Sequence, residues 1–164
     1  MSDELFNTHY QSPIGILKIS GTEHYISQIY FPDKQDESMV STNHAILQQC
    51  VEELIEYFNG KRLSFTIPIH QKGTLFQTKV WNELLCIPFG KTINYLTLAK
   101  RLGDPKCIRA AASANGKNNI AIIVPCHRVI GSNESLVGYA GGLHRKKWLL
   151  DLENKIGNGV QTLF

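Results

Sequence analysis

Long hydrophobic runs and closely spaced cysteines are both missing from this sequence. No apolar run approaches the roughly 20 residues of a membrane-spanning helix. Residues 1–4 are acidic and polar, which predicts no secretory signal. The four cysteines, at positions 50, 86, 107 and 126, show neither the paired spacing of a zinc site nor the density of a disulfide framework. We therefore expect reduced thiols in a cytoplasmic protein (nuclear in a eukaryote), with no metal, no cofactor and no membrane partner.

The chain has 164 residues and an ordinary apolar fraction of 43%, enough for a real core in one domain, or in one domain with a smaller partner. Its net charge of +3 conceals a strong asymmetry. Residues 1–70 contain four Lys and Arg against nine Asp and Glu, a balance of −5, whereas residues 71–164 contain thirteen against five, a balance of +8. This segregation favours a polyanionic partner for the second part, although a basic surface can also be merely solvated.

The first part reads as a small sheet with one helix. Short segments rich in β-branched and aromatic residues predict strands over 5–10, 14–19 and 25–31 in an antiparallel meander, followed by a polar loop over 33–41. Apolar residues at helical spacing predict a helix over 46–58, which ends before a glycine. No catalytic cluster is visible here, so we interpret this part as a structural unit.

The second part is predicted to be mostly helical. Thr74 and Gln77 have the spacing of a capping box, and Asn94 is placed to cap a helix over 95–102 packed through its leucines. Asp104, followed by a proline, starts another helix almost at once. Two helices separated by so short a turn have the form of a helix-turn-helix, although many helical corners look similar.

The helix after this turn carries small side chains. Arg109 is followed by the run Ala-Ala-Ala-Ser-Ala at 110–114. A face of small residues lets a helix approach its target closely in a narrow groove, with the single long Arg109 reaching further in. An alanine-rich helix that merely packs in the core explains the same run, and the sequence leaves both readings open.

Cys126 stands out as a candidate nucleophile. Pro125 fixes its own φ and pushes Val124 toward an extended conformation, and the β-branched neighbours suit a buried strand. His127 and Arg128 follow at once, so the sulfur is expected to sense positive charge or a base, and either raises the thiolate fraction. The alternative is a small core cysteine beside a surface His-Arg pair.

The final helix is predicted over 143–153. Its basic residues at 145–147 are expected to extend the basic surface. Glu153 falls at the edge of the apolar stripe, where a carboxylate needs a donor, and His127 is the partner of interest. An ordinary surface glutamate is the alternative.

Several motifs occur together between Phe76 and Glu153. They are Val80-Trp81, Ile87-Pro88-Phe89-Gly90, Tyr95, Leu98-Ala99, Gly103-Asp104-Pro105, Arg109-Ala110, Pro125-Cys126-His127-Arg128-Val129, Gly138-Tyr139 with Gly141-Gly142, and Leu149-Leu150 with Glu153. In this order and spacing they resemble the methylated-DNA–protein-cysteine methyltransferase family, the O6-alkylguanine-DNA alkyltransferases. The Pro-Cys-His-Arg-Val core is the most specific part of the resemblance.

The resemblance implies an α+β fold in two domains. Residues 1–70, which match only in likely topology, are expected to form a ribonuclease-H-like antiparallel sheet with a helix. Residues 71–164 are expected to form a mostly helical domain with a winged-helix or helix-turn-helix DNA-binding motif and the active-site cysteine.

The resemblance also implies the reaction. A thiolate attacks the alkyl carbon on guanine O6 in line, and the stable thioether that results limits each molecule to one use. O4-alkylthymine is left open as a second substrate. The partner is double-stranded DNA containing O6-alkylguanine, bound by a monomer, with cooperativity on DNA left open. Because a base inside a duplex is out of reach, it is flipped into a pocket from the minor groove. Arg109 fills the vacated stack, and the carbonyls of Cys126 and Val129 read the guanine amine.

Roles for single residues follow from the same resemblance. Cys126 is the acceptor, His127 takes the thiol proton through a water, and Glu153 orients and charges the imidazole. Tyr95 crowds a phosphate and offers a proton to the departing guanine, and Asn118 braces the cysteine segment. The expected DNA contacts are Arg109, Tyr95, Ala110, Ser113, Lys106 and Arg128, and the expected pocket residues are Val129, Tyr139, Ala140 and Lys146.

Two positions depart from the family pattern. Asn119 stands where many relatives have proline, so the hinge at Asn118 is expected to be less stiff. Ala140 stands where some relatives have a serine that helps to hold guanine O6. One hydrogen bond contributes a net of roughly 0.5–1.5 kcal/mol, so this loss should tune the rate or the substrate range without abolishing activity.

Two other functions are weighed against repair. An alkyltransferase-like protein that binds the lesion without chemistry lacks the acceptor cysteine, whereas Cys126 is present. A Cys-His hydrolase acting by acyl transfer needs an oxyanion site and turnover, and it leaves the basic helix pair unexplained.

Overall fold

The computed structural model describes residues 4–33 and 44–159, which fall into two compact units. The N-terminal unit holds the residues up to 71 together with 119–121, and the C-terminal unit holds 72–118 and the residues from 122 onward. The sequence predicted one domain boundary, after residue 70. It did not predict that residues 119–121 return to the first unit. Apart from Asp33, the loop predicted over 33–41 lies outside the described residues.

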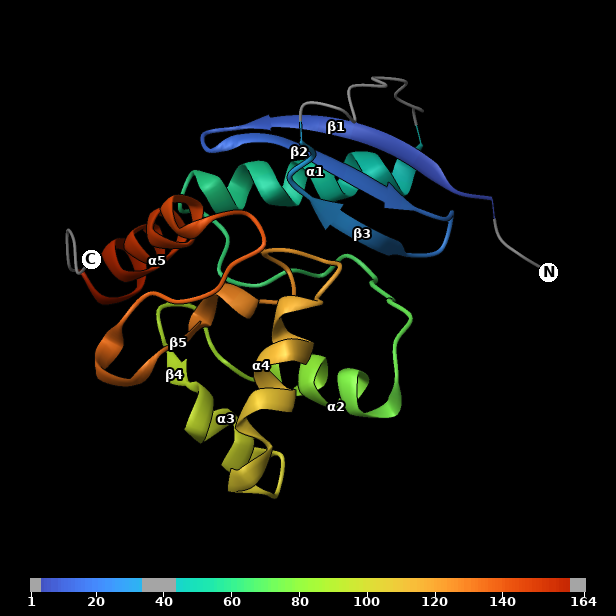
Figure 1. Ribbon diagram of the computed structural model, residues 1–164. Coiled ribbons are helices and arrows are strands. Elements are labelled where there is room, and N and C mark those ends of the chain that lie inside the picture. The colour runs from blue at the N-terminus through green and yellow to red at the C-terminus, as the bar shows by residue number, and fades with distance from the viewer. Residues whose placement is uncertain (1–3, 34–43, 160–164) are drawn as a thin grey trace. The chain divides into compact units, whose positions relative to one another are not determined.

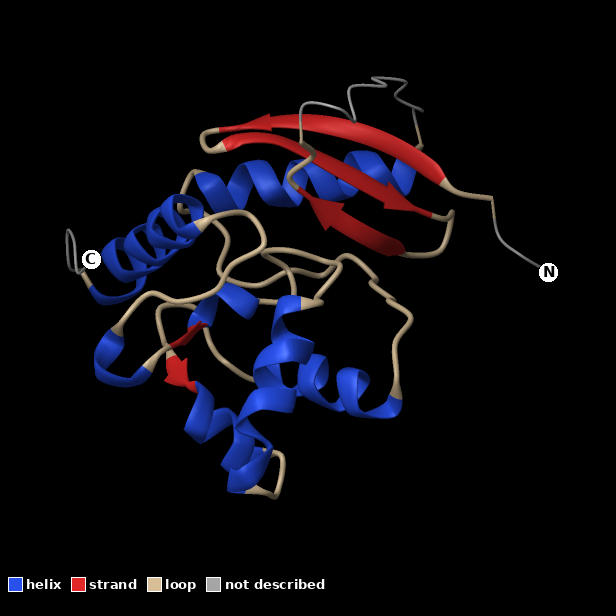
Figure 2. Ribbon diagram, in the orientation of Figure 1, coloured by secondary structure: helices blue, strands red, loops and turns tan. Residues whose placement is uncertain are grey.

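The sheet of the N-terminal unit is the predicted antiparallel meander. Strands β1 (Phe6–Ser12), β2 (Gly15–Gly21) and β3 (Ile26–Tyr30) pair in the order β1-β2-β3 (Figures 1 and 2). The β1–β2 register runs from Phe6 opposite Gly21 to Ser12 opposite Gly15. The two-residue turn between these strands is closed by the Ser12 hydroxyl, which donates to the Gly15 carbonyl at 2.6 Å.

Helix α1 (Ala45–Phe58) covers one face of this sheet (Figure 1). Its buried stripe confirms the predicted helical spacing, and Cys50 lies on it. Each fully buried large aliphatic or aromatic side chain on such a stripe contributes roughly 1.5–3 kcal/mol. The apolar core between helix and sheet consists of Leu17, Ile19, Ile26, Ile29, Leu47, Cys50, Leu54 and Tyr57. The helix ends at Phe58 with Asn59 as its C-cap, and Gly60 takes the left-handed conformation (φ 74°) that favours glycine there.

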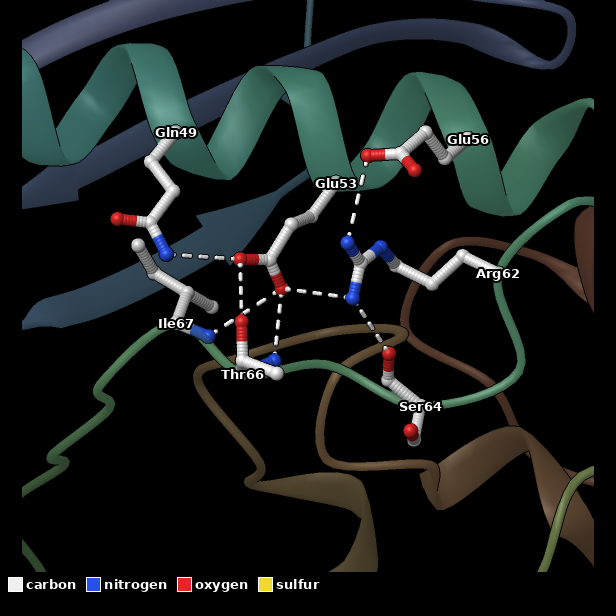
Figure 3. A network of polar contacts seen from close by, with 7 residues as sticks. All are labelled: Gln49, Glu53, Glu56, Arg62, Ser64, Thr66 and Ile67. Carbon is white, nitrogen blue, oxygen red and sulfur yellow. Dashed lines mark hydrogen bonds and ion pairs between the residues drawn. The ribbon is translucent and has the colours of Figure 1, made fainter.

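A buried carboxylate ties the segment after α1 to the helix (Figure 3). Glu53 Oε1 accepts hydrogen bonds from the backbone N–H groups of Thr66 (2.8 Å) and Ile67 (3.2 Å), and Oε2 accepts from the Gln49 amide (2.9 Å). Arg62 lies 3.6 Å from Glu53 and is also paired with the more exposed Glu56. Burial alone raises the pKa of Glu53, but these hydrogen bonds outweigh burial and hold that pKa below its ordinary value.

The segment 119–121 extends the N-terminal unit beside β3. The Ile29 N–H donates to the Asn119 carbonyl at 2.8 Å, and the Ala121 N–H donates to the Ile29 carbonyl at 3.0 Å. The Asn119 N–H itself donates to Gln71 Oε1 at 2.9 Å. Proline has no N–H and cannot make this bond. The departure at position 119 therefore adds a hydrogen bond next to the hinge.

The C-terminal unit is helical, as predicted. Its helices are α2 (Leu75–Leu84), α3 (Tyr95–Arg101), α4 (Ile108–Gly116) and α5 (Leu143–Asn158), and the short strands β4 (Ile93–Asn94) and β5 (Val129–Ile130) pair in parallel. The capping box of Thr74 with Gln77 is present, and Asn94 Oδ1 accepts from the Thr97 N–H at 2.7 Å. Helix α5 extends five residues beyond its predicted end at 153.

Two local predictions differ from the structure. Asp104 caps the Lys106 N–H at 2.9 Å, but Pro105–Cys107 form a 3₁₀ turn, so the α-helix begins only at Ile108. Leu96 was expected in the core of the 95–102 helix, and it is 40% exposed. In a helix of seven residues only a narrow stripe faces the interior, and Leu98 and Ala99 occupy it.

Helix α4 uses its small residues on both faces. Ala111 and Ala114 are buried, and the Ala114 carbonyl accepts from the Trp81 indole N–H of α2 at 2.9 Å. The opposite face of the helix is open to solvent. The two readings of the alanine run are thus compatible, because one face packs and the other is exposed. No helix in the described part of the chain is long and apolar enough to cross a membrane.

Candidate active site

The cysteine segment is buried but mostly not extended. Pro125 has φ −82° and ψ 64°, an inverse γ-turn in which the Cys126 N–H donates to the Val124 carbonyl at 2.8 Å. Residues 126–128 then form a 3₁₀ turn, and only Val129–Ile130 pair as a strand. The proline fixes φ as expected, but ψ is set by this turn. Cys126 is half-buried at the head of the turn.

Two amides from the end of α4 hold this turn. Asn118 Nδ2 donates to the Val124 carbonyl at 2.8 Å, and Asn115 Nδ2 lies 3.4 Å from the Cys126 carbonyl. Asn118 was predicted to brace the segment, and its side chain contacts it. Asn115 was not predicted as a site residue. It lies in the last turn of α4, and Asn118 follows the end of the helix, where its N–H donates to the Asn115 carbonyl at 3.3 Å.

His127, Glu153 and Arg128 form a buried network. His127 Nε2 lies 2.6 Å from Glu153 Oε2. The Arg128 guanidinium donates through Nε to Oε1 at 2.7 Å and through Nη2 to Oε2 at 3.1 Å. Its Nη1 donates to the Ile87 carbonyl at 2.7 Å. The exposed fractions are 0% for His127, 1% for Glu153 and 7% for Arg128, so solvent screens these charges little.

The electrostatics of the network follow from burial and pairing. Burial lowers the pKa of His127, Glu153 opposes this shift, and the Arg128 charge adds to it. Burial raises the pKa of Glu153, but His127 and Arg128 together bring it well below its usual range. The site therefore holds an ionised Glu153 and a neutral imidazole. With Nε2 directed at Glu153, the buried Nδ1 has no hydrogen-bond partner among the described residues and is free to accept a proton.

Burial also raises the pKa of the Cys126 thiol. Asn118, through a hydrogen bond, and the Lys146 charge act in the opposite direction without cancelling the effect. The resting cysteine is thus a thiol at neutral pH, and it needs a base before it can act as a nucleophile.

Lys146 lies inside the protein, which corrects the prediction that it extends the basic surface. Its side chain is fully buried, and Nζ donates to the carbonyls of Val129 (2.7 Å), Val137 (2.7 Å) and Gly138 (3.2 Å). Burial lowers the pKa of Lys146 to about 8, although Cys126 partly opposes the shift. One ammonium group thus fastens the loop before α5 to the strand that follows the cysteine turn.

Arg128, predicted as a DNA contact, lies in the interior and is 7% exposed. The guanidinium is enclosed by Glu153 and the Ile87 carbonyl and lies 5.8 Å from the centre of the Phe89 ring. Such a group is not exposed to a phosphate. The local sequence shows only a basic residue beside the cysteine and does not tell on which side of the turn it projects.

Two tyrosines lie around the sulfur. Tyr95, the first residue of α3, is half-buried, and Tyr139 carries a buried hydroxyl without a hydrogen-bond partner in the described chain. Burial raises the pKa of both hydroxyls, and the nearby Cys126 adds to both shifts. Of the other predicted pocket residues, Val129 is buried and Ala140 is exposed. Lys106, Arg109, Ala110 and Ser113, the remaining predicted DNA contacts, are all exposed at or near the start of α4.

Fold and site together define an α+β protein with a small sheet-and-helix domain and a helical domain that carries Cys126 next to a buried network of His127, Arg128 and Glu153. Two family models match the chain: the 6-O-methylguanine DNA methyltransferase, ribonuclease-like domain, over residues 5–71, and the 6-O-methylguanine DNA methyltransferase, DNA binding domain, over residues 75–155. The chain therefore belongs to the 6-O-methylguanine DNA methyltransferase family, whose enzymes repair DNA by alkyl transfer. This confirms the resemblance and the enzyme class predicted from the sequence.

Relatives and solved structures agree with this assignment. The methylated-DNA–protein-cysteine methyltransferase of Methanosarcina acetivorans is 42% identical over 148 residues, 88% of this chain and 95% of that protein. The constitutive enzyme of that name from Bacillus subtilis is 39% identical over 156 residues, 90% of this chain and 94% of that protein. The crystal structure of Mycobacterium tuberculosis O6-methylguanine methyltransferase superposes with a TM-score of 0.84 at 37% identity, covering 93% and 94% of the two chains. A structure of Mycobacterium tuberculosis OGT in complex with DNA gives 0.84 at 38% identity, covering 92% and 93%.

Proposed function

We propose that this chain repairs duplex DNA by moving the alkyl group of O6-alkylguanine to Cys126 in a single, irreversible event. The C-terminal domain, residues 71–164, binds DNA and accepts the alkyl group, and the N-terminal domain, residues 1–70, is structural. The observation that supports this most directly is the buried His127 that follows Cys126 in the chain: its imidazole is neutral, its Nε2 lies 2.6 Å from Glu153, and its Nδ1 has no hydrogen-bond partner among the described residues.

In the proposed reaction His127 acts as the base. Its Nδ1 takes the Cys126 proton through a water, and Glu153 stabilises the imidazolium that forms. The thiolate attacks the alkyl carbon as the C–O6 bond breaks, and the bonding pair stays with guanine. Tyr95 supplies a proton to the departing base. The product thioether has no easy route back to a thiol, so the protein acts once.

DNA engagement is assigned to the exposed start of α4. The lesion is flipped out of the duplex from the minor groove, and Arg109 fills the space that it leaves. Lys106, Ala110 and Ser113 lie near Arg109 in sequence and share its exposure, which suits close approach to the groove. Tyr139, Val129, Ala140 and the loop fastened by Lys146 form the base pocket.

Intact-protein mass spectrometry after incubation with excess duplex containing O6-methylguanine tests this function. We expect one added methyl group per molecule, mapped to the Cys126 peptide, and no further change with time. Cys126→Ala should bind the duplex without gaining mass, whereas Cys86→Ala, which removes an exposed thiol, should be methylated as the natural sequence is. An unchanged mass indicates a lesion-binding protein, and repeated turnover indicates a hydrolase. Either result contradicts the proposal.

A further inference from the structure

Helix α5 continues for five residues beyond Glu153, and the reaction described above uses none of them. The end of this helix lies against residues 87–90, part of the connection from α2 to β4 and called here the 87–90 segment. Asn158, the last residue of the helix, donates from Nδ2 to the Gly90 carbonyl at 2.7 Å. One side chain thus ties the end of the helix to the segment.

The two backbones approach so closely that a side chain on either of two glycines would be crowded. A Cβ at Gly157 would lie 3.3 Å from the Gly90 Cα and 3.3 Å from Phe89 Cδ1. A Cβ at Gly90 would lie 3.3 Å from the Glu153 carbonyl oxygen, and Gly90 also has a φ of 81°. Glycine inside a helix is unfavourable relative to alanine. The close packing against the 87–90 segment accounts for a glycine at position 157.

The 87–90 segment also holds the buried network of the site. The Ile87 carbonyl accepts from Arg128 Nη1 at 2.7 Å. The Gly90 N–H is directed at Glu153 Oε1 across a longer distance of 3.5 Å. The segment thus contacts both charged partners of the imidazole, and the end of α5 fixes the segment.

We propose that Asn158 is a positioning residue for alkyl transfer, which fixes the 87–90 segment so that Glu153 and Arg128 stay aligned. This inference rests on the proposed function. Asn158 takes no part in the movements of protons and electrons. The thiol proton passes through water to His127, the thiolate takes the alkyl group, and the electron pair of the broken C–O6 bond stays on guanine. The effect of Asn158 reaches the imidazole only through the carboxylate.

Loss of the Asn158 bond should change the charge balance of the network. When the segment moves, its carbonyl no longer holds Arg128 against the carboxylate, so the charge of Glu153 is neutralised less. Burial still lowers the pKa of His127, but Glu153 raises it and the Arg128 charge lowers it, so this pKa should rise. Lys146 also lowers the pKa of His127, but its carbonyl partners lie outside the segment, and its contribution should stay the same. A protonated imidazole cannot accept the thiol proton.

The pH profile of single-turnover methyl transfer from the O6-methylguanine duplex tests this link. Asn158→Leu should slow transfer about fivefold on the acid side, the effect of one hydrogen bond, and should move the acid limb of the profile to higher pH. A merely structural loss lowers the rate by one factor at every pH. An unchanged rate, or a slower rate with an unshifted acid limb, would overturn the proposal. Asn82→Leu, the same change at an exposed position of α2, is the matched control and should alter neither rate nor profile.

Two further variants approach the same contact in other ways. Gly157→Ala keeps Asn158 but adds a methyl group that crowds the 87–90 segment. It should shift the acid limb in the same direction, although alanine favours the helix. In an Arg128→Met background, Asn158→Leu should move the limb much less, because the charge that the segment holds is gone. An equal shift in both backgrounds contradicts the proposal.

If the natural sequence is never methylated, the proposed function fails, but the link from Asn158 to the imidazole can still be measured. NMR titration of the His127 ring should then show a higher pKa in Asn158→Leu than in the natural sequence. An unchanged His127 titration in the folded variant contradicts the inference by itself. The two failures are therefore distinguishable.

Discussion

Glu153 is the residue on which the charges of the site depend. Its two oxygens are shared between His127 and Arg128, at distances of 2.6–3.1 Å. Arg128 neutralises much of the carboxylate charge, so Glu153 orients the imidazole without converting it permanently to imidazolium. A permanently protonated His127 has no lone pair with which to accept the thiol proton. The arginine of the Pro-Cys-His-Arg-Val motif is thus a support for the carboxylate.

Glu153→Gln removes this charge with little change in size. We expect methyl transfer to slow by about 10²-fold or more, because a general base loses its orienting partner. We also expect a loss of about 3 kcal/mol in the free energy of unfolding, because Arg128 is left buried and unpaired. Asp151→Asn is the control on the same helix: its pair with Lys147 is partly exposed, and its loss should change stability by less than about 0.5 kcal/mol. Equal effects of the two variants on the transfer rate and on stability would contradict the role of Glu153 as the shared partner of His127 and Arg128.

Arg128→Met tests the corrected place of Arg128. Because the guanidinium is buried, binding to undamaged DNA should stay as in the natural sequence, whereas Arg109→Met at an exposed position should weaken it. The His127 pKa, measured by NMR, should rise, since the charge that helps to lower it is gone. Combining Arg128→Met with Glu153→Gln removes both charges and should recover stability without recovering the rate. A large loss of DNA affinity in Arg128→Met alone would show that Arg128 contacts DNA after all.

At the scale of elements, helix α1 and the segment that follows it depend on one carboxylate. Glu53 accepts two backbone N–H bonds from residues 66 and 67 and two side-chain bonds, and it is 3% exposed (Figure 3). Its neighbour Glu56 shares the same arginine but is exposed. The two residues therefore form a natural comparison between a buried and an exposed member of one network.

Glu53→Gln should lower the stability of the N-terminal unit by about 2 kcal/mol or more. The neutral amide offers only one acceptor oxygen to the donors that bind the two carboxylate oxygens of Glu53. Glu56→Gln should change it by less than about 0.5 kcal/mol. Both tryptophans, Trp81 and Trp148, belong to the C-terminal unit, so their fluorescence does not report on this change. Hydrogen exchange of the α1 amides is the appropriate measurement. Equal exchange in the two variants would show that the buried bonds contribute little.

At the scale of the whole molecule, both units depend on ionised buried carboxylates, and stability should therefore fall in acid. The pKa values of Glu53 and Glu153 are held below the ordinary 4.5, so their contributions are complete above that pH and are lost as pH falls through the folded-state values. The pKa of His127 is lowered from 6.5, so this residue also reduces stability as the pH falls, and it begins to do so at a higher pH than the two carboxylates. In urea unfolding between pH 7 and pH 3, the midpoint concentration should fall as the pH falls. Glu53→Gln should weaken this pH dependence of the midpoint below pH 4.5. A constant midpoint would contradict this linkage.

The sequence by itself determined most of the elements and the family. The meander, α1, the capping box at Thr74 and the cap at Asn94 depend on residues within a turn or two of one another, and such interactions can be read from spacing. The Pro-Cys-His-Arg-Val motif is likewise contiguous, and its family assignment is confirmed. The pairing of His127 with Glu153 was one of two readings, and the geometry supports it.

Only the tertiary structure decided which polar groups face inward. Arg128 meets partners 25 and 41 residues away, Lys146 binds carbonyls on two other segments, and 119–121 return to the N-terminal unit. Local periodicity does not encode these choices, because a long basic side chain is equally compatible with solvent and with a buried acceptor. The energy of each depends on whether the fold supplies carbonyl or carboxylate oxygens that replace the lost water. Asn115 was not predicted for the same reason, since its partner, the Cys126 carbonyl, lies on the cysteine turn.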